Sequence, residues 1–437
     1  MSEASHPSHD GEHRRKRRKL TPDEKLLQAR IEAASKEQAP LIDTPSIPSE
    51  LPVRQHSRRP MPAAPAVAGL LSQPVVKGCL RVLKMATRTT VVIYLIVLAI
   101  VLVAIDRMGQ SNLTTAALMY LPPWPWIAPA FFLLLPALFF DWKAAPALLL
   151  AIALFLQVYL DLQWRTAPLS SPPTPFETLR ALTWNRGQSK HASLQPLKNE
   201  LKPDFILLQD AAGRGKGYKG DKNYAEFRAV AEAGEFVLLS RWPILSSEVL
   251  STRSDADNLP PGNLGAARFV VLAAGTRVTL YSVHLPSPRD ALESYKRGSF
   301  LWGILGIPGT PWEAKKLRYQ VFWDEQIARA AEILRRIQSE EGPVLVMGDF
   351  NTPAMGPIYR MYAETTLQDA HRSTGGGLGF TFPGDTGNPL ALFQPWLRLD
   401  QIFASPHWQI LQCAPQPARA QHLPVFGEFK LAKEPSL

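Results

Sequence analysis

The fold of this chain is decided by residues 344–351, Val344-Leu345-Val346-Met347-Gly348-Asp349-Phe350-Asn351. The first four residues form an apolar run that is too short for a buried helix, so the run predicts a buried strand. Gly348 follows this run and precedes an acidic residue, Asp349, and an amide residue, Asn351. We therefore expect Asp349 and Asn351 to lie at the end of a strand, where they can meet polar groups from neighbouring strands.

The same design recurs at four other places, where an apolar run begins or ends in a polar residue. These are Leu182-Thr183-Trp184-Asn185, Phe205-Ile206-Leu207-Leu208-Gln209-Asp210, Thr279-Leu280-Tyr281-Ser282-Val283-His284 and Leu399-Asp400-Gln401-Ile402-Phe403. A single Asn or Asp after a strand is most often a turn residue or a helix cap. A series of such strand ends, alternating irregularly with helices, predicts α/β layers with functional groups at the strand ends. We expect strands at 180–184, 205–209, 236–240, 268–273, 277–285, 344–347 and 401–404, and helices at 194–201 and 312–338.

Over residues 178–431, these stretches and their order resemble the sequence motifs of the endonuclease/exonuclease/phosphatase superfamily. That superfamily has a deoxyribonuclease-like fold. The matching stretches include Thr183-Trp184-Asn185, Ser240-Arg241-Trp242-Pro243-Ile244, Val283-His284-Leu285, Gly348-Asp349-Phe350-Asn351 and Gln421-His422. The resemblance implies an α/β fold, a four-layer sandwich of two packed mixed β-sheets flanked by helices. It also implies hydrolysis of phosphoester bonds with Mg²⁺ or Mn²⁺.

The resemblance assigns catalytic roles to five residues. His422 matches the catalytic histidine of the family, and Asp400 matches the carboxylate that fixes its tautomer. Asp349 and Asn351 match the pair that orients the attacking water and the phosphate. His284 matches a histidine that contacts phosphate oxygens, so Asn351 and His284 are also expected to bind substrate; a satisfied core histidine is the alternative for His284.

The resemblance also implies a metal site, and here the sequence departs from the family. Asp210 occupies the position of a metal-binding Glu, with Asn185 beside it, and it is one methylene shorter. Gln421 replaces a metal-binding Asp, which removes one unit of negative charge. Both changes weaken a divalent-cation site. A degenerate, non-catalytic domain that acts as a membrane-bound binding or scaffold module is therefore the alternative to an enzyme, although fold maintenance alone has no need of this polar set.

The substrate is open among nucleic acid, a lipid head group and a small phosphate ester, because the family hydrolyses all of these and a fold cannot choose among them. The domain lacks the run of Lys/Arg interleaved with aromatics that is typical of a tight duplex-DNA binder. Residues 286–318 form an insertion rich in aromatics and glycine, which is either a packed surface loop or a segment near the bilayer. No specific protein partner is predicted.

Three apolar stretches in the N-terminal half predict a multi-pass membrane region in contact with the lipid bilayer. They cover residues 91–105, 118–140 and 144–160, and the first, with its flanking threonines and alanine, approaches the roughly 20 residues that cross a bilayer. Trp124, Trp126 and Trp164 suit the interfacial belts. The short link at 141–143 predicts a hairpin of the last two stretches, although several prolines make the middle one less certain to span.

The N-terminal tail is basic, with 16 Lys/Arg against 9 Asp/Glu in residues 1–88, which gives +7 of the formal net charge of +10. Its composition predicts disorder. The protein is expected in an inner or plasma membrane, and by the positive-inside rule its tail lies on the cytoplasmic side. Three crossings then place the C-terminal domain outside the cytoplasm, whereas two crossings would place it in the cytoplasm. The expected organisation is a tail at 1–87, about three transmembrane helices at 88–165, a Pro-rich linker at 166–177 and a catalytic domain at 178–437.

Overall fold

The computed structural model of the protein describes residues 73–164, 178–187, 193–252, 259, 261–292, 311–385 and 395–432. The chain divides into two units, Met1–Ala68 and Gly69–Leu437, and every described residue belongs to the second. The expected tail up to residue 72, the Pro-rich linker and residues 293–310 of the insertion lie outside the described residues.

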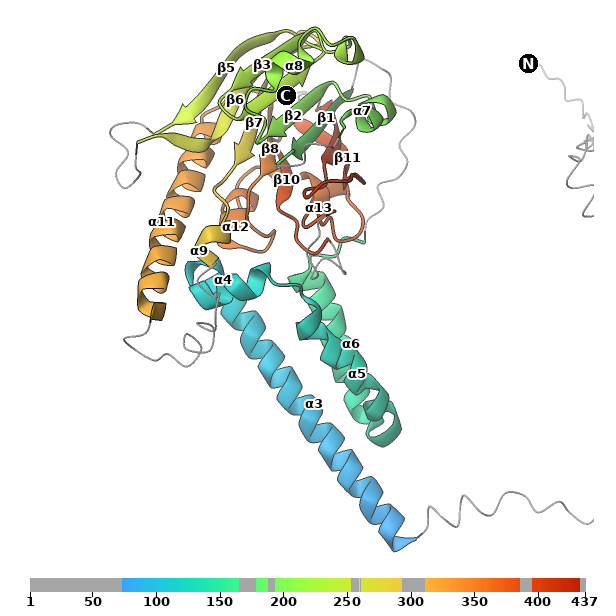
Figure 1. Ribbon diagram of the computed structural model, residues 1–437. Coiled ribbons are helices and arrows are strands. Elements are labelled where there is room, and N and C mark those ends of the chain that lie inside the picture. The colour runs from blue at the N-terminus through green and yellow to red at the C-terminus, as the bar shows by residue number, and fades with distance from the viewer. Residues whose placement is uncertain are drawn as a thin grey trace, which may run out of the picture. The chain divides into compact units, whose positions relative to one another are not determined.

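Two six-stranded sheets form the centre of the C-terminal domain (Figure 1). The strand order of the first sheet is β11 (Trp408–Pro415), β12 (Val425–Leu431), β1 (Thr178–Asn185), β2 (Phe205–Gln209), β4 (Phe236–Ser240), β3 (Ala229–Ala233). The order of the second is β5 (Ile244–Ser251), β6 (Asn263–Ala273), β7 (Thr276–His284), β8 (Val344–Asp349), β10 (Asp400–Ala404), β9 (Gln368–Asp369). The pairs β1–β2 and β7–β8 are parallel and the others are antiparallel, so both sheets are mixed.

Strand alternation builds the layers, because successive side chains point to opposite faces of a sheet. In β2, Phe205 and Leu207 face the second sheet, whereas Ile206 and Leu208 face the helices outside. The helices α7 (Gln195–Leu201) and α8 (Gly215–Tyr218) lie on the first sheet, and α11 (Pro311–Gln338) and α12 (Pro357–Ala363) pack on the second. The short helices α9 (Arg289–Leu292) and α13 (Ala370–Thr374) complete the domain. The predicted four-layer sandwich is confirmed.

The register of the second sheet brings three polar residues into one row. Parallel pairing of β7 with β8 places His284 opposite Asp349, and antiparallel pairing of β8 with β10 places Asp349 opposite Asp400. Gly348 permits this register, because its φ is +143° and a Cβ there would lie 2.0 Å from the carbonyl oxygen of Val283. Only glycine fits so close an approach of two backbones.

The predicted membrane region, called the membrane region below, consists of α3 (Pro74–Met108), α4 (Leu113–Tyr120), α5 (Trp124–Phe140) and α6 (Ala145–Leu154), which continues as a π-helical turn, Phe155–Tyr159. Two helical segments, Pro74–Ser111 and Trp142–Tyr159, are long and apolar enough to cross a membrane. The expected middle stretch forms α4 and α5, which are bent by 65° at their junction and make a third span if the pair crosses as one. Pro122 and Pro123 lie at the break, where a missing N–H and a fixed φ prevent helix continuation. The first helix begins at Pro74, within the expected tail.

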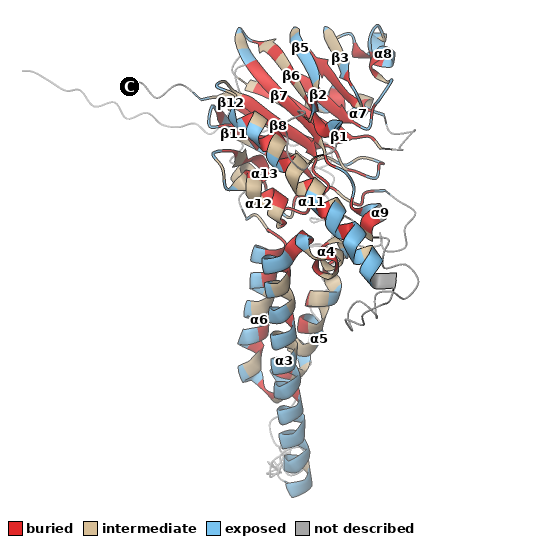
Figure 2. Ribbon diagram, turned by 90° about the vertical axis from the view of Figure 1, so that its left-hand side faces the viewer, coloured by how far each residue is buried: buried red, intermediate tan, exposed pale blue. Residues whose placement is uncertain are grey.

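The outer surfaces of α3, α5 and α6 carry exposed apolar residues, and the pale blue of Figure 2 shows the exposure along α3 and α6. Ile93, Phe132 and Leu150 are 57%, 77% and 60% exposed, which is typical of side chains that face lipid. At the turn between α5 and α6, Asp141 accepts a hydrogen bond of 2.7 Å from Arg88 Nε of α3. This pair ties the α5–α6 hairpin to the N-terminal half of α3.

Candidate active site

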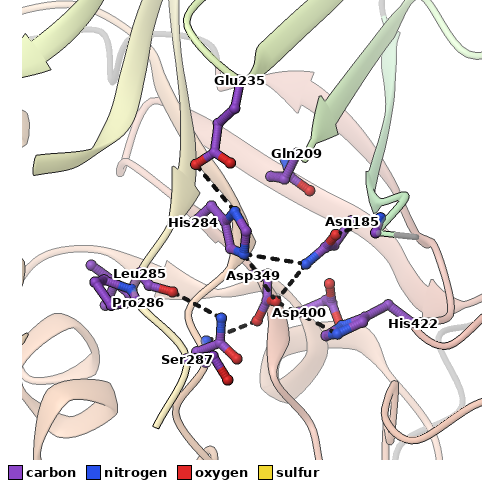
Figure 3. A network of polar contacts seen from close by, with 12 residues as sticks. Asn185, Gln209, Glu235, His284, Leu285, Pro286, Ser287, Asp349, Asp400 and His422 are labelled. Carbon is purple, nitrogen blue, oxygen red and sulfur yellow. Dashed lines mark hydrogen bonds and ion pairs between the residues drawn. The ribbon is translucent and has the colours of Figure 1, made fainter. Parts of the chain in front are cut away.

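Asp349 lies at the centre of a buried polar cluster at the ends of the strands (Figure 3). Its Oδ2 accepts a hydrogen bond of 2.7 Å from Asn185 Nδ2, and its Oδ1 accepts one of 2.8 Å from the backbone N–H of Asn351. The Nε2 atoms of His284 and His422 lie 3.8 Å and 3.7 Å from Asp349 Oδ2. Five of the residues predicted from strand ends and motifs are therefore brought together.

His422 is paired with Asp400 on one side of Asp349. Its Nδ1 lies 2.9 Å from Asp400 Oδ2. Burial lowers the pKa of His422, but the carboxylates of Asp400 and Asp349 outweigh this effect and raise the pKa to about 9. Burial raises the pKa of Asp400 above its ordinary value, against the attraction of His422. The pair is thus a histidine whose orientation and charge are held by a buried acid.

His284 is paired with Glu235 on the other side. Its Nδ1 lies 3.2 Å from Glu235 Oε1. Burial lowers the pKa of His284, but Glu235 and Asp349 more than compensate, so that the pKa is raised. Sequence reasoning missed Glu235, because this residue belongs to the turn between β3 and β4 and follows no apolar run. Two histidine–carboxylate pairs therefore flank Asp349.

Buried polar groups beneath the cluster join the two sheets. Gln209 is fully buried at the end of β2 and donates hydrogen bonds of 3.0 Å to Thr183 Oγ1 and 2.8 Å to Ser282 Oγ. Because Thr183 belongs to β1 and Ser282 to β7, the Gln209 amide fixes one sheet against the other. Bonded buried groups of this kind hold neighbouring side chains in one arrangement.

Asn351 lies in the loop that follows β8 and has a left-handed backbone, with φ of +47°. Its Nδ2 donates a hydrogen bond of 2.8 Å to the carbonyl oxygen of Leu285, directly after His284. Asn adopts this conformation more readily than most residues. Hydrogen bonds of its side chain and its backbone hold Asn351 in it. The loop thereby keeps Asn351 beside both Asp349 and the end of β7.

Comparison with known proteins agrees with this architecture. Residues 182–424, more than half of the chain, match the model of the Endonuclease/Exonuclease/phosphatase family. The chain belongs to the endonuclease/exonuclease/phosphatase family. Members of this family are generally hydrolases of phosphoesters and typically depend on divalent metal ions.

Solved structures with a similar fold share little sequence with the chain. A family member from Beutenbergia cavernae is 18% identical, with 60% of this chain and 73% of that chain covered and a TM-score of 0.39. A humanized D. rerio TDP2 is 16% identical, with coverage of 58% and 99% and a TM-score of 0.39. A Bacteroides thetaiotaomicron mannosyl-6-phosphatase is 11% identical, with coverage of 57% and 99% and a TM-score of 0.38. No significant match was found among curated proteins.

The residues of the cluster fit the divalent cation that the family implies. Potential ligand atoms of Asp349, Asp400 and His422 all lie within 4.8 Å of one another. Among the described residues Asp400 Oδ1 has no hydrogen-bond partner, although it is buried. A buried carboxylate oxygen without a partner is costly unless a cation or water satisfies it, and oxygen ligands are those that Mg²⁺ and Mn²⁺ prefer.

Of the three metal ligands predicted from the sequence, one lies in the cluster and two are exposed. Asn185 belongs to the cluster but turns its Nδ2 toward Asp349, while its Oδ1 accepts a hydrogen bond of 2.9 Å from the N–H of Gly187. Asp210 is exposed just after β2, and in the described part of the chain no hydrogen bond or ion pair joins its side chain to the cluster. Gln421 is exposed beside His422. Metal binding by these three residues stays a prediction.

Proposed function

We propose that the protein is a membrane-anchored hydrolase of phosphoesters that depends on a divalent metal ion. The observation that carries the proposal is the meeting of two histidine–carboxylate pairs around one buried acid, Asp349. Burying ionisable groups is unfavourable and gives no advantage in stability over apolar packing. Groups with perturbed pKa values that converge at a strand edge are characteristic of catalytic sites.

The two pairs can supply both proton transfers of hydrolysis. A bond forms between the oxygen of water and phosphorus, and the bond from phosphorus to the leaving oxygen breaks. The proton of the water passes to the carboxylate of one pair, and the leaving oxygen takes a proton from the protonated histidine of the other, since the pKa of both histidines is raised. Asp349 lies between His284 and His422 and holds both rings by charge. Asn351 and His284 are the residues that we assign to the phosphate oxygens.

Asp349 and Asp400 would hold the cation, with Asp210 and Gln421 as further candidates. When bound, a divalent ion neutralises charge on the phosphoryl oxygens and makes water more acidic. Apolar helices long enough to cross a bilayer support the membrane assignment.

The test is hydrolysis of bis-p-nitrophenyl phosphate and p-nitrophenyl phosphate by the full-length protein in detergent, with Mg²⁺, Mn²⁺ or EDTA. We expect turnover that requires metal and falls about 100-fold or more in His422→Ala. His407→Ala is the matched control, because His407 is exposed beyond the opposite end of β10. Absence of turnover by the wild type, together with absence of Mn²⁺ binding, would instead support the non-catalytic binding module.

A further inference from the structure

The membrane region reaches directly into the loop that carries Asn351. Tyr120, the last residue of α4, donates a hydrogen bond of 2.7 Å from its hydroxyl to the carbonyl oxygen of Asn351. Gln110, between α3 and α4, donates one of 2.6 Å from Nε2 to the Tyr120 hydroxyl. Its Oε1 accepts one of 2.8 Å from the Thr352 hydroxyl. In Figure 1, α4 lies at the end of the domain that faces the membrane helices, beside α9.

This contact is closely fitted on the domain side. A Cβ at Gly356 would lie 2.4 Å from Gln110 Oε1 and 2.9 Å from Thr352 Oγ1, so a larger residue would displace the Gln110 amide. Gln110 is 2% exposed, and Tyr319 of α11 donates a hydrogen bond of 2.7 Å to its carbonyl oxygen. A buried amide is unfavourable unless its polar atoms are bonded, and here each of them is.

The contacted residue, Asn351, follows Asp349, the centre of the site, by two positions. The same Asn351 whose carbonyl oxygen is held by Tyr120 donates its backbone N–H to Asp349 Oδ1. On the other side of the loop, Gln401 of β10 donates a hydrogen bond of 3.0 Å to the carbonyl oxygen of Thr352. The loop is thus clamped between a strand of the domain and the membrane region.

We propose that Tyr120 and Gln110 are positioning residues for the active site, so that the membrane region is a working part of the hydrolase and not only a tether. The inference rests on the proposed function. Attachment alone is provided elsewhere, because Asp161 after α6 binds Arg398 and Arg372 at 3.0 Å and 2.9 Å. The Tyr120 contact adds control over the left-handed Asn351, a conformation that persists only where its surroundings determine it.

The test compares Tyr120→Phe with Tyr94→Phe in the full-length protein. Each substitution removes one hydroxyl that donates to a backbone carbonyl, at 2.7 Å for Tyr120 and 2.8 Å for Tyr94, but the acceptor of Tyr94 is Trp126 within the membrane region. We expect Tyr120→Phe to lower kcat for bis-p-nitrophenyl phosphate about 5- to 10-fold with little change in KM. We expect Tyr94→Phe to match the wild-type kcat and KM, and Tyr120→Phe to have the lower melting temperature of the two because it leaves Gln110 Nε2 without its acceptor.

A second readout does not depend on catalysis. Amide hydrogen exchange of residues 350–356 should be faster in Tyr120→Phe than in Tyr94→Phe. Equal kcat and equal exchange in the two variants would overturn the inference. An inactive wild type would refute the proposed function, whereas the exchange comparison would still decide whether Tyr120 orders the loop.

Discussion

Asp349 concentrates the physical constraints of the site in one side chain. Its carboxylate is fully buried, both oxygens accept hydrogen bonds, and two imidazoles lie within 3.8 Å of Oδ2. A buried carboxylate has lost its hydration, and the hydrogen-bond donors and positive charges around it compensate for this loss. Every group that contacts Asp349 therefore influences its orientation.

Glu235 is the residue whose role is most readily tested. We expect Glu235→Gln to lower kcat by about 10- to 100-fold, because it removes the charge that orients His284 and supports its protonated form. The measurement is steady-state hydrolysis of bis-p-nitrophenyl phosphate at saturating Mn²⁺. Glu341→Gln is the control, since Glu341 is exposed before β8, at the end of that strand away from Asp349. Equal rates for the two variants would remove Glu235 from the site.

Glu235 could not be predicted from the sequence, whereas the other site residues could, and the reason is local. His284, Asp349 and Asp400 each begin or end an apolar run, so their placement at strand ends could be predicted from the sequence. Glu235 reaches His284 only because β3 and β4 fold into a hairpin at the edge of the first sheet. The orientation of the Asn185 amide depends on the N–H of Gly187, which no sequence pattern reports.

At the scale of elements, burial decides what the sequence could predict. The predicted bounds of β2 and β4 match the structure, because all five residues of each strand are buried and apolar runs report this directly. β5 was not predicted, since most of its residues are exposed and Ser246, Ser247 and Glu248 interrupt its apolar residues. The middle membrane segment was predicted as one span, but the prolines after Tyr120 separate α4 from α5.

The junction of β9 and α13 carries a buried charge cluster with a defined pH dependence. Asp369 caps α13 and lies 2.8 Å from Arg398, which is itself buried. Burial raises the pKa of Asp369, but Arg398 outweighs burial and lowers the pKa to about 2. Because this value lies below that of the unfolded chain, the stabilisation is present above about pH 4 and is lost as pH falls toward 2.

We therefore expect Asp369→Asn to reduce the free energy of unfolding at pH 7 by on the order of 2 kcal/mol. The variant should then lose less stability than the wild type between pH 5 and pH 2. Thermal unfolding of the full-length protein in detergent across this range would show the difference. Asp385→Asn, at an exposed position, should behave as the wild type does. A wild-type acid transition that Asp369→Asn leaves unchanged would contradict the assignment.

At the scale of the whole molecule, the membrane region and the family domain share a polar boundary. Arg360 of α12 contacts Asp106 of α3 at 3.3 Å, and Arg398 contacts Asp161 after α6. The ends of α3 and α6 are therefore both held at the domain, whereas the α5–α6 turn is held by Arg88. If α3, α5 and α6 all cross the membrane, the start of α3 and the domain lie on opposite sides of it.

The two cysteines allow this topology to be measured. Cys79 is exposed near the start of α3, and Cys413 is buried in β11. We expect a membrane-impermeant maleimide to label Cys79 in inside-out vesicles and not in intact cells. Ser247→Cys, at an exposed position of β5 in a Cys79→Ser background, should show the opposite pattern. Labelling of both sites from the same side would show that the domain shares the side of the N-terminus.

The most direct test of the central claim is the fate of solvent oxygen. The full-length protein would be incubated with bis-p-nitrophenyl phosphate and Mn²⁺ in water enriched in ¹⁸O. The ¹⁸O content of the products would be measured by mass spectrometry. A metal-assisted attack of water on phosphorus predicts one ¹⁸O atom in the phosphoryl product and none in p-nitrophenol. Absence of product under these conditions, or ¹⁸O in p-nitrophenol, would contradict the account.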